Sequence, residues 1–139
     1  MDHGDELYWE QEYAELMEIA REHLLPQQKY GETVVLKTKT GNIYITQIPD
    51  YQNCKERELL ENRCIQRLID AEDTEVTACL ATMNGKEPEI LSWNFRSRLI
   101  ELDERNLKTE CFLWGGEDTV YLKPFSSLLP PGHTIRKST

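Results

Sequence analysis

The spacing of apolar residues along the chain alternates between a helical period and a strand period. Residues 5–24 place apolar side chains three and four positions apart, with carboxylates on the opposite side. This spacing predicts an amphipathic helix. Asp5 is the expected N-cap, and Pro26 ends the element. The predicted inner face consists of Tyr13, Leu16, Met17, Ala20 and Leu24.

The next segments predict a hairpin, a helix and a buried strand. Residues 33–39 and 42–47 are rich in β-branched side chains, and Gly41 and Asn42 between them suit a tight turn. A helical period returns over residues 53–71, where Leu60, Cys64 and Leu68 share one line. Residues 75–83 form a short unbroken apolar run, which is typical of a central strand buried on both faces.

The last third of the chain predicts a helix over residues 93–103 and strands over 111–114 and 119–122, joined by a turn at Gly115-Gly116. Pro124 fits the first turn of a short final helix, which Pro130-Pro131-Gly132 would end. Strands that alternate with helices imply crossover connections and partly parallel pairing. We therefore predict one α/β domain over residues 1–139, with three α/β/α layers and a mixed five-stranded sheet.

Composition narrows the class of protein. The chain has 139 residues, 39% of them hydrophobic, with 16 basic and 25 acidic side chains and a net charge of −9. This acidity argues against binding a nucleic acid polymer, which requires clustered basic residues. Eight of the acidic residues lie in residues 2–22 beside a single arginine, so most of the net negative charge lies on the first predicted helix. This acidic face is either a solvated surface or a docking face for a partner.

The same composition gives expectations about location. No apolar run approaches the roughly 20 residues that span a bilayer, and the acidic N-terminus is unlike a signal peptide. We therefore expect a cytoplasmic protein with no membrane partner. The four cysteines show no paired spacing and are expected to be reduced thiols: Cys54, Cys64, Cys79 and Cys111.

Four motifs occur in an order that is similar to the cytidine deaminase family over nearly the whole chain. A hairpin with Thr40-Gly41-Asn42-Ile43-Tyr44 precedes a helix that opens with Cys54-Lys55-Glu56-Arg57, which looks like the family's Cys-Ala-Glu-Arg. Ser92-Trp93-Asn94-Phe95-Arg96-Ser97-Arg98 stands where the family has Ser-Pro-Cys-Gly-x-Cys-Arg. The tail Phe125-Ser126-Ser127-Leu128-Leu129-Pro130 resembles the family's closing Leu-Leu-Pro segment.

The resemblance implies a zinc site that this sequence only half retains. The family binds zinc through one His or Cys on the first motif helix and two Cys on the second, while a glutamate that is not a ligand moves protons. Cys54 and Glu56 match the first half, whereas Asn94 and Ser97 stand where the two cysteines belong. Neither an amide nor a hydroxyl replaces a thiolate on zinc. Cys54 is thus the only residue that matches a family ligand, and we expect no metal and no cofactor.

The other cysteines and the histidines do not complete the site. Cys64 lies about 15 Å further along the same predicted helix, too far to share a metal with Cys54. Cys79 and Cys111 fall in predicted core strands, where cysteine behaves as a small hydrophobic residue. The three histidines lie outside both motif helices.

Glu56 is the candidate for a vestigial catalytic carboxylate, and its alternative role is a first-turn residue favoured by the helix dipole. By resemblance, Arg98 could pair with Glu56 where the family holds zinc. Gln47, Trp93 and Asn94 are the candidate substrate-binding residues. For Gln47 the alternative is a solvent-facing strand residue, and for Trp93, as for Trp114, it is a core or interface role.

These residues predict a catalytically silent, zinc-free protein of deaminase fold that binds a partner or a nucleoside-like small molecule. Two alternatives stay open. The first is an active zinc-dependent cytidine or nucleoside deaminase whose ligands are displaced, for instance to Cys79 or Cys111. The second is a structural or interaction subunit without a ligand pocket. The resemblance also implies assembly into a homodimer or homotetramer.

Overall fold

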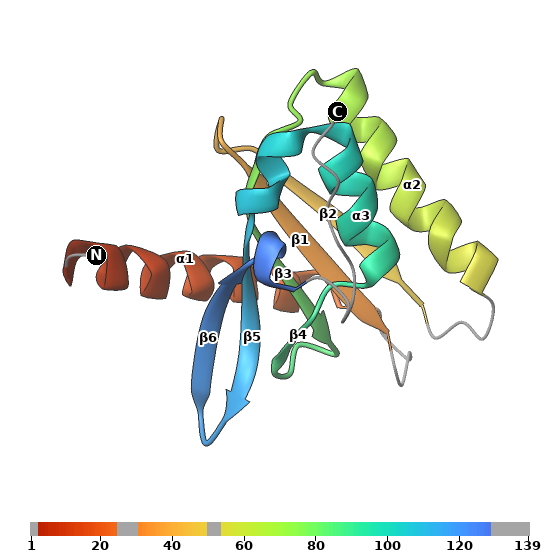
Figure 1. Cartoon of the computed structure of the whole chain (residues 1–139). Coiled ribbons are helices and arrows are strands. Elements are labelled where there is room, and N and C mark those ends of the chain that lie inside the picture. The colour runs from red at the N-terminus through yellow and green to blue at the C-terminus, as the bar shows by residue number, and fades with distance from the viewer. Residues whose placement is uncertain (1–2, 25–30, 50–53, 129–139) are drawn as a thin grey trace.

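The chain forms a central sheet with α1 on one face and α2 and α3 on the other, as Figure 1 shows. The structure is a computed structural model that describes residues 3–24, 31–49 and 54–128. Its helices are α1 (His3–Glu22), α2 (Cys54–Asp70) and α3 (Trp93–Leu102), with 3₁₀ turns at Glu104–Lys108 and Phe125–Ser127. Its strands are β1 (Glu32–Thr38), β2 (Ile43–Ile48), β3 (Val76–Met83), β4 (Pro88–Glu89), β5 (Glu110–Gly116) and β6 (Thr119–Pro124).

The sheet runs in the order β2-β1-β3-β5-β6, and the short β4 pairs with β3. All pairs are antiparallel except β3 and β5, which are parallel and place Cys79 opposite Cys111. A parallel pair requires a crossover, and the segment containing α3 supplies it. The predicted mixed sheet is therefore confirmed, with β4 as an addition that the sequence pattern did not indicate.

Two apolar clusters hold the three layers together. The α1-face cluster consists of Leu16, Met17, Ala20, Val35, Ala78, Leu80 and Phe112. The α2/α3-face cluster consists of Val34, Leu36, Ile48, Cys64, Leu68, Val76, Cys79, Ala81, Leu91, Phe95, Leu99, Cys111 and Phe125. From Ala78 to Ala81, successive residues of β3 belong alternately to the two clusters, so the strand is buried on both faces and its sequence there is continuously apolar.

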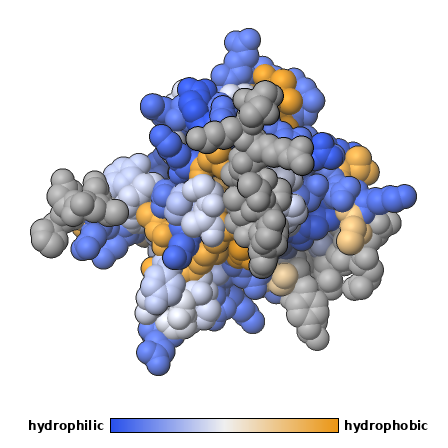
Figure 2. All heavy atoms as spheres, viewed as in Figure 1, coloured by the Kyte–Doolittle hydropathy of each residue, from blue (hydrophilic) through white to orange (hydrophobic). Residues whose placement is uncertain are grey.

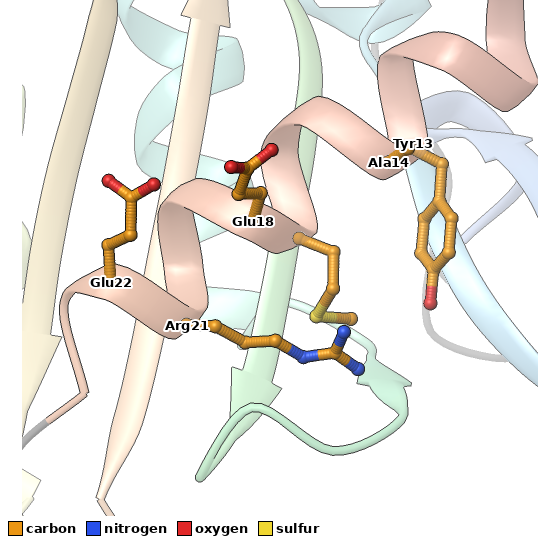
Figure 3. Close-up of a pocket in the computed structure, with 6 residues that line it drawn as sticks. Tyr13, Ala14, Glu18, Arg21 and Glu22 are labelled. Atoms are coloured by element: carbon orange, nitrogen blue, oxygen red, sulfur yellow. The ribbon is translucent and has the colours of Figure 1, made fainter.

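Helix α1 packs through the face that its periodicity predicted, except that Leu24 lies after the end of the helix and is 37% exposed. Leu16 and Ala20 are fully buried, and Arg21 Nε donates to the carbonyl of Gly85 at 3.0 Å. Figure 3 shows Arg21 and Tyr13 on the side of α1 that faces the β3–β4 turn, while Glu18 and Glu22 extend away from it. The outer carboxylates are exposed, except that Glu12 is buried and pairs with Lys37 of β1 at 2.9 Å. None of the helices in the described ranges is long and apolar enough to cross a membrane.

The β1–β2 hairpin is joined to the end of α2 by one carboxylate. Asp73 is almost fully buried and accepts hydrogen bonds from Thr38 Oγ1 at 2.8 Å, Tyr44 OH at 2.9 Å, and Thr40 Oγ1 and Asn42 Nδ2 at 3.0 Å. Burial alone would raise the pKa of Asp73, but the four hydrogen bonds lower it below its ordinary value. The ionised carboxylate therefore fixes the position of the hairpin.

Helix α2 ends with an unusual residue in a common arrangement. The Asp73 amide donates to the Leu68 carbonyl and the Glu72 amide to the Ile69 carbonyl, both at 3.0 Å, which is the Schellman pattern. Glu72 has a φ of 52°, in the left-handed region that this position requires and that glycine adopts more easily.

Three local predictions were wrong. The turn between β5 and β6 is formed by Glu117 and Asp118, with φ of 50° and 60°, because Gly115 and Gly116 still belong to β5. A Cβ at Gly115 would lie 2.1 Å from the Tyr121 ring, so a larger residue at this position would have to displace that ring. The others concern the two ends of the described chain.

Helix α1 begins at His3, so Asp5 lies inside it and is not the N-cap. The predicted final helix is a single 3₁₀ turn, because Pro124 still pairs with Glu110 in the sheet and the buried Phe125 follows at once. Residues 130–132, predicted to end that helix, lie outside the described residues.

Candidate functional site

The carboxylate of Glu61 is the centre of a hydrogen-bond network between α2 and the start of α3. Its Oε2 accepts from Ser92 Oγ at 2.7 Å and Arg57 Nε at 3.1 Å, and its Oε1 accepts from Asn94 Nδ2 at 2.7 Å. Arg57 Nη2 also pairs with Glu32 of β1 at 2.5 Å. We call these five residues the Glu61 network.

The network carries two carboxylates for one guanidinium. Burial raises the pKa of Glu32 above its ordinary value, although the Arg57 guanidinium beside it acts in the opposite direction. Ser92 caps α3 by accepting a hydrogen bond from the Phe95 amide at 3.1 Å. The Glu61 carboxylate thus lies at the N-terminus of α3, where the helix dipole favours negative charge.

The inner line of α2 explains why Glu61 faces this corner. Arg57, Glu61, Cys64 and Leu68 are spaced by four, three and four residues, so they share one side of the helix. The apolar pattern alone identified Cys64 and Leu68 and missed Glu61. Extending their line towards the start of the helix would have found it.

The network leaves little chemistry available at Glu61. The residue is 0% exposed, and each carboxylate oxygen already accepts at least one internal hydrogen bond. A general base must reach the proton that it removes from a substrate. The arrangement instead suits a role in which Glu61 joins β1, α2 and α3 through Arg57, Ser92 and Asn94.

The first-motif residues lie outside the network. Cys54 and Glu56 are exposed on the first turn of α2, whereas Asn94 of the second motif contacts Glu61. Ser97 Oγ donates to the Asn94 carbonyl at 3.0 Å. Arg98 is exposed, and the ion pairs of the described residues do not include one between Arg98 and Glu56.

The three candidate substrate-binding residues are not brought together. Gln47 Nε2 donates to the His23 carbonyl at the end of α1, on the sheet face opposite α2 and α3. Trp93 is half-buried at the start of α3, with the guanidinium carbon of Arg96 5.2 Å from its ring centroid.

Arg96 itself is buried and serves the packing of the α3 region. Its Nε donates to the Leu91 carbonyl at 2.8 Å and its Nη1 to the Leu128 carbonyl. Burial lowers the pKa of Arg96 below its ordinary value. Trp114, the other tryptophan singled out in the sequence, is exposed on β5.

The donor atoms near the two motifs do not fit a zinc ion. One exposed thiol (Cys54), one amide (Asn94) and one hydroxyl (Ser97) are a poor set of zinc ligands. Within residues 3–24, 31–49 and 54–128, no group of three or more His, Cys, Asp or Glu side chains could hold a metal. Cys79 and Cys111 are fully buried, and burial keeps the pKa of the Cys79 thiol well above its ordinary value.

A cavity of about 500 Å³ lies between β2 and α2. Arg67, one of its lining residues, donates from Nη2 to the Ile45 carbonyl at 2.7 Å. Gln66 Nε2 donates to Asp70 at 2.8 Å within α2. On the α2 side its lining combines hydrogen-bond donors and acceptors with apolar groups: Leu60, Arg63, Gln66, Arg67 and Asp70. Gln47 borders the cavity from β2, but its side-chain amide is bonded to the His23 carbonyl on the other face of the sheet.

No protein-family model and no curated protein matches the chain. Solved structures do match. The cytidine deaminase from Burkholderia pseudomallei is 20% identical with a TM-score of 0.57, covering 84% of this chain and 93% of that one. The cytidine deaminase from Bacillus anthracis is 20% identical with a TM-score of 0.58, covering 89% and 87%. The cytidine deaminase from Mycobacterium leprae is 13% identical with a TM-score of 0.61, covering 85% and 97%.

The architecture is thus a three-layer α/β/α sandwich around a mixed sheet. More particularly, the chain has a cytidine deaminase-like fold, as its motif order predicted. At such identities the similarity establishes only the fold, and any activity has to be inferred from the residues of the site.

Proposed function

We propose that this chain is a catalytically silent, zinc-free protein of cytidine deaminase-like fold that binds a partner or a nucleoside-like small molecule. The observation that carries this proposal is the 2.7 Å hydrogen bond from Asn94 Nδ2 to the buried Glu61 carboxylate. Asn94 stands where the family resemblance places a zinc ligand. Here its side chain holds α3 against α2 instead.

The chemistry of the neighbouring side chains supports the absence of a metal site. A catalytic zinc needs three nitrogen, sulfur or carboxylate ligands and an open position. The only thiol at the two motifs is Cys54, and Ser97 donates within α3. Glu56 is exposed at the first turn of α2. In zinc deaminases the corresponding carboxylate transfers protons for a zinc-bound water, and without a metal there is no such water for Glu56 to deprotonate.

The cavity between β2 and α2 supports binding of a nucleoside-like ligand. Ligand sites of this size combine an apolar surface with a few fixed polar groups. Leu60 offers apolar surface, while Arg63 and Gln66 offer donors and an acceptor for a base or sugar. The residues that line this cavity do not include Trp93 or Asn94, whose role in ligand binding stays a prediction from the sequence.

Metal analysis of the purified chain tests catalytic silence. We expect zinc far below one ion per chain and a thermal midpoint that a chelator leaves unchanged, because the Glu61 network needs no metal. About one zinc per chain would overturn the zinc-free proposal, and a fall in absorbance when cytidine is added would favour the active deaminase instead.

Thermal denaturation with cytidine, uridine and adenosine tests the ligand. A nucleoside that binds only the folded state stabilises it by RT ln(1 + [L]/Kd), so the midpoint rises with the logarithm of the nucleoside concentration once this exceeds the dissociation constant. Gln66→Ala, which changes an exposed cavity residue, should abolish the shift, and the exposed α2 variant Glu58→Ala should keep it. If none of the nucleosides stabilises the chain, the structural or interaction subunit is the better assignment.

We further propose that the chain is cytoplasmic, self-associates as a homodimer or homotetramer, and binds no nucleic acid polymer. Leu59 and Ile69 of α2 are 56% and 44% exposed, which supports an apolar contact between copies. All four cysteines are free, in keeping with a reducing compartment. Light scattering across a dilution series measures the assembly, and a monomer at all concentrations would contradict it.

A further inference from the structure

A second cavity lies on the opposite face of the sheet from the Glu61 network. It has a volume of about 370 Å³ and occupies the angle between α1 and the β5–β6 hairpin. Figure 2 shows hydrophobic surface in this angle. We call it the aromatic groove, after the character of its principal lining residues: Trp9, Tyr13, Phe112, Tyr121, Glu10 and Glu110.

The aromatic groove is built from rings on both of its walls. Trp9 and Tyr13 lie four residues apart on α1 and so project from the same side of the helix. Their ring centroids are 6.1 Å and 5.3 Å from that of Phe112 on β5. Tyr121 on β6 is 53% exposed. Aromatic faces carry the negative part of the ring quadrupole and attract cations.

The groove also presents carboxylates without a cation of its own. Glu6 and Glu10 are exposed on α1, one turn apart. Glu110 is half-buried at the start of β5, and the ion pairs of the described residues do not include one to it. Burial raises the pKa of Glu110, and no opposite charge offsets the effect. A cation in the groove would supply the missing partner.

We propose that the aromatic groove binds a small organic ammonium ion with an apolar body. Aromatic rings beside carboxylates are the surroundings that favour an alkylated ammonium over a neutral molecule of the same shape. A volume of about 370 Å³ is at the lower end of the range found for small-molecule sites. This site is separate from the proposed nucleoside cavity, so either proposal can fail without the other.

The test compares choline with 3,3-dimethylbutan-1-ol, in which a carbon replaces the charged nitrogen. Each is titrated into the full chain while the indole resonance of Trp9 is followed by NMR and assigned by its loss in Trp9→Leu. We expect choline to bind at least about tenfold more tightly than the alcohol, because only choline gains from the rings and carboxylates together. Equal affinities, or no movement of the Trp9 resonance with choline, would overturn the proposal.

Two matched pairs of variants locate the site. Glu110→Gln keeps the shape of the side chain and should weaken choline binding about fivefold or more while leaving the alcohol unchanged. Glu117→Gln, in the exposed β5–β6 turn, is its control and should have no effect. Tyr121→Leu should likewise weaken choline, whereas Trp114→Leu, which removes an exposed ring outside the groove lining, should not. Equal effects within each pair would refute the location.

Discussion

Replacing Glu61 is the sharpest perturbation of the network that joins α2 to α3. In Glu61→Ala, three donors on Arg57, Ser92 and Asn94 lose their acceptor at once. Arg57 keeps Glu32, but the Glu61 carboxylate is 0% exposed among partly buried donors, so water does not easily take its place. Removing one member of a buried charged pair costs about 3–5 kcal/mol, and we expect Glu61→Ala to fall in this range.

Glu61→Gln should be much milder, for a geometric reason. The carboxamide keeps one oxygen for Ser92, and the Asn94 amide can turn over to present its oxygen to the new amino group. Only the charge opposite Arg57 is lost, and Arg57 still pairs with Glu32. We expect a loss of about 1–2 kcal/mol, the cost of about one charge-assisted hydrogen bond.

Exchanging the carboxylate of Glu61 and the amide of Asn94 distinguishes loss of these hydrogen bonds from a general loss of packing. Asn94→Asp alone places two carboxylates face to face and should destabilise strongly. Combining it with Glu61→Gln restores one carboxylate and one amide in reversed positions. The double variant should therefore be more stable than Asn94→Asp alone.

Urea denaturation at neutral pH measures these free energies, and an unchanged m-value shows that the unfolded state is unaffected. Glu58→Ala, an exposed α2 residue, is the control and should lie within about 0.5 kcal/mol of wild type. The reasoning is refuted if Glu61→Ala costs less than about 1 kcal/mol, or if Glu61→Gln costs as much as Glu61→Ala.

Three further predictions concern the turns and the hairpin. Asp73→Asn should destabilise by about 2 kcal/mol at pH 7. Because the folded protein lowers the pKa of Asp73, the ionised carboxylate stabilises the fold fully above the unfolded pKa near 3.9, and this stabilisation is lost as the pH falls through the folded pKa. The difference in unfolding free energy between wild type and Asp73→Asn should therefore narrow between pH 7 and lower pH in denaturation experiments. A difference that widens at lower pH would contradict this. Glu72→Gly should stabilise by up to about 1 kcal/mol, since glycine adopts φ of 52° without a Cβ clash; a lower thermal midpoint would be the contrary result. Gly115→Ala should displace the exposed Tyr121 ring and weaken choline binding in the NMR titration, and unchanged affinity would contradict the placement of that ring.

Periodicity predicted the parts of the fold in which burial follows the apolar pattern. The alternating and continuous apolar runs located β1, β2 and β3, and the three- and four-residue spacing of Leu16 and Ala20 identified the inner face of α1. The sequence also placed Cys79 and Cys111 in core strands, and the parallel register sets them opposite each other. In all these elements, apolar side chains supply most of the contacts.

The missed features depend on polar side chains and on contacts between distant segments. Glu61 is as buried as a core leucine, but an apolar pattern passes over a charged residue. The partners that make its burial possible are distant in the sequence. Ser92 and Asn94 are 31 and 33 residues from Glu61, and Glu32 is 25 residues from Arg57. Gln47 was predicted to be a substrate-binding residue, yet the face of the sheet on which its side chain lies is set by the register of β2 with β1. Sequence spacing alone does not contain these relationships.

The central place of β3 has a consequence for how the molecule opens. β3 has β1 on one edge and β5 on the other, and each of its faces is covered by a separate apolar cluster. Its amides point towards the neighbouring strands and reach solvent when the centre of the sheet separates, so their hydrogen exchange should report the global unfolding free energy. Helix α1 depends on one cluster alone, and its amides should exchange through a smaller, separate opening that leaves the α2 and α3 layer in place.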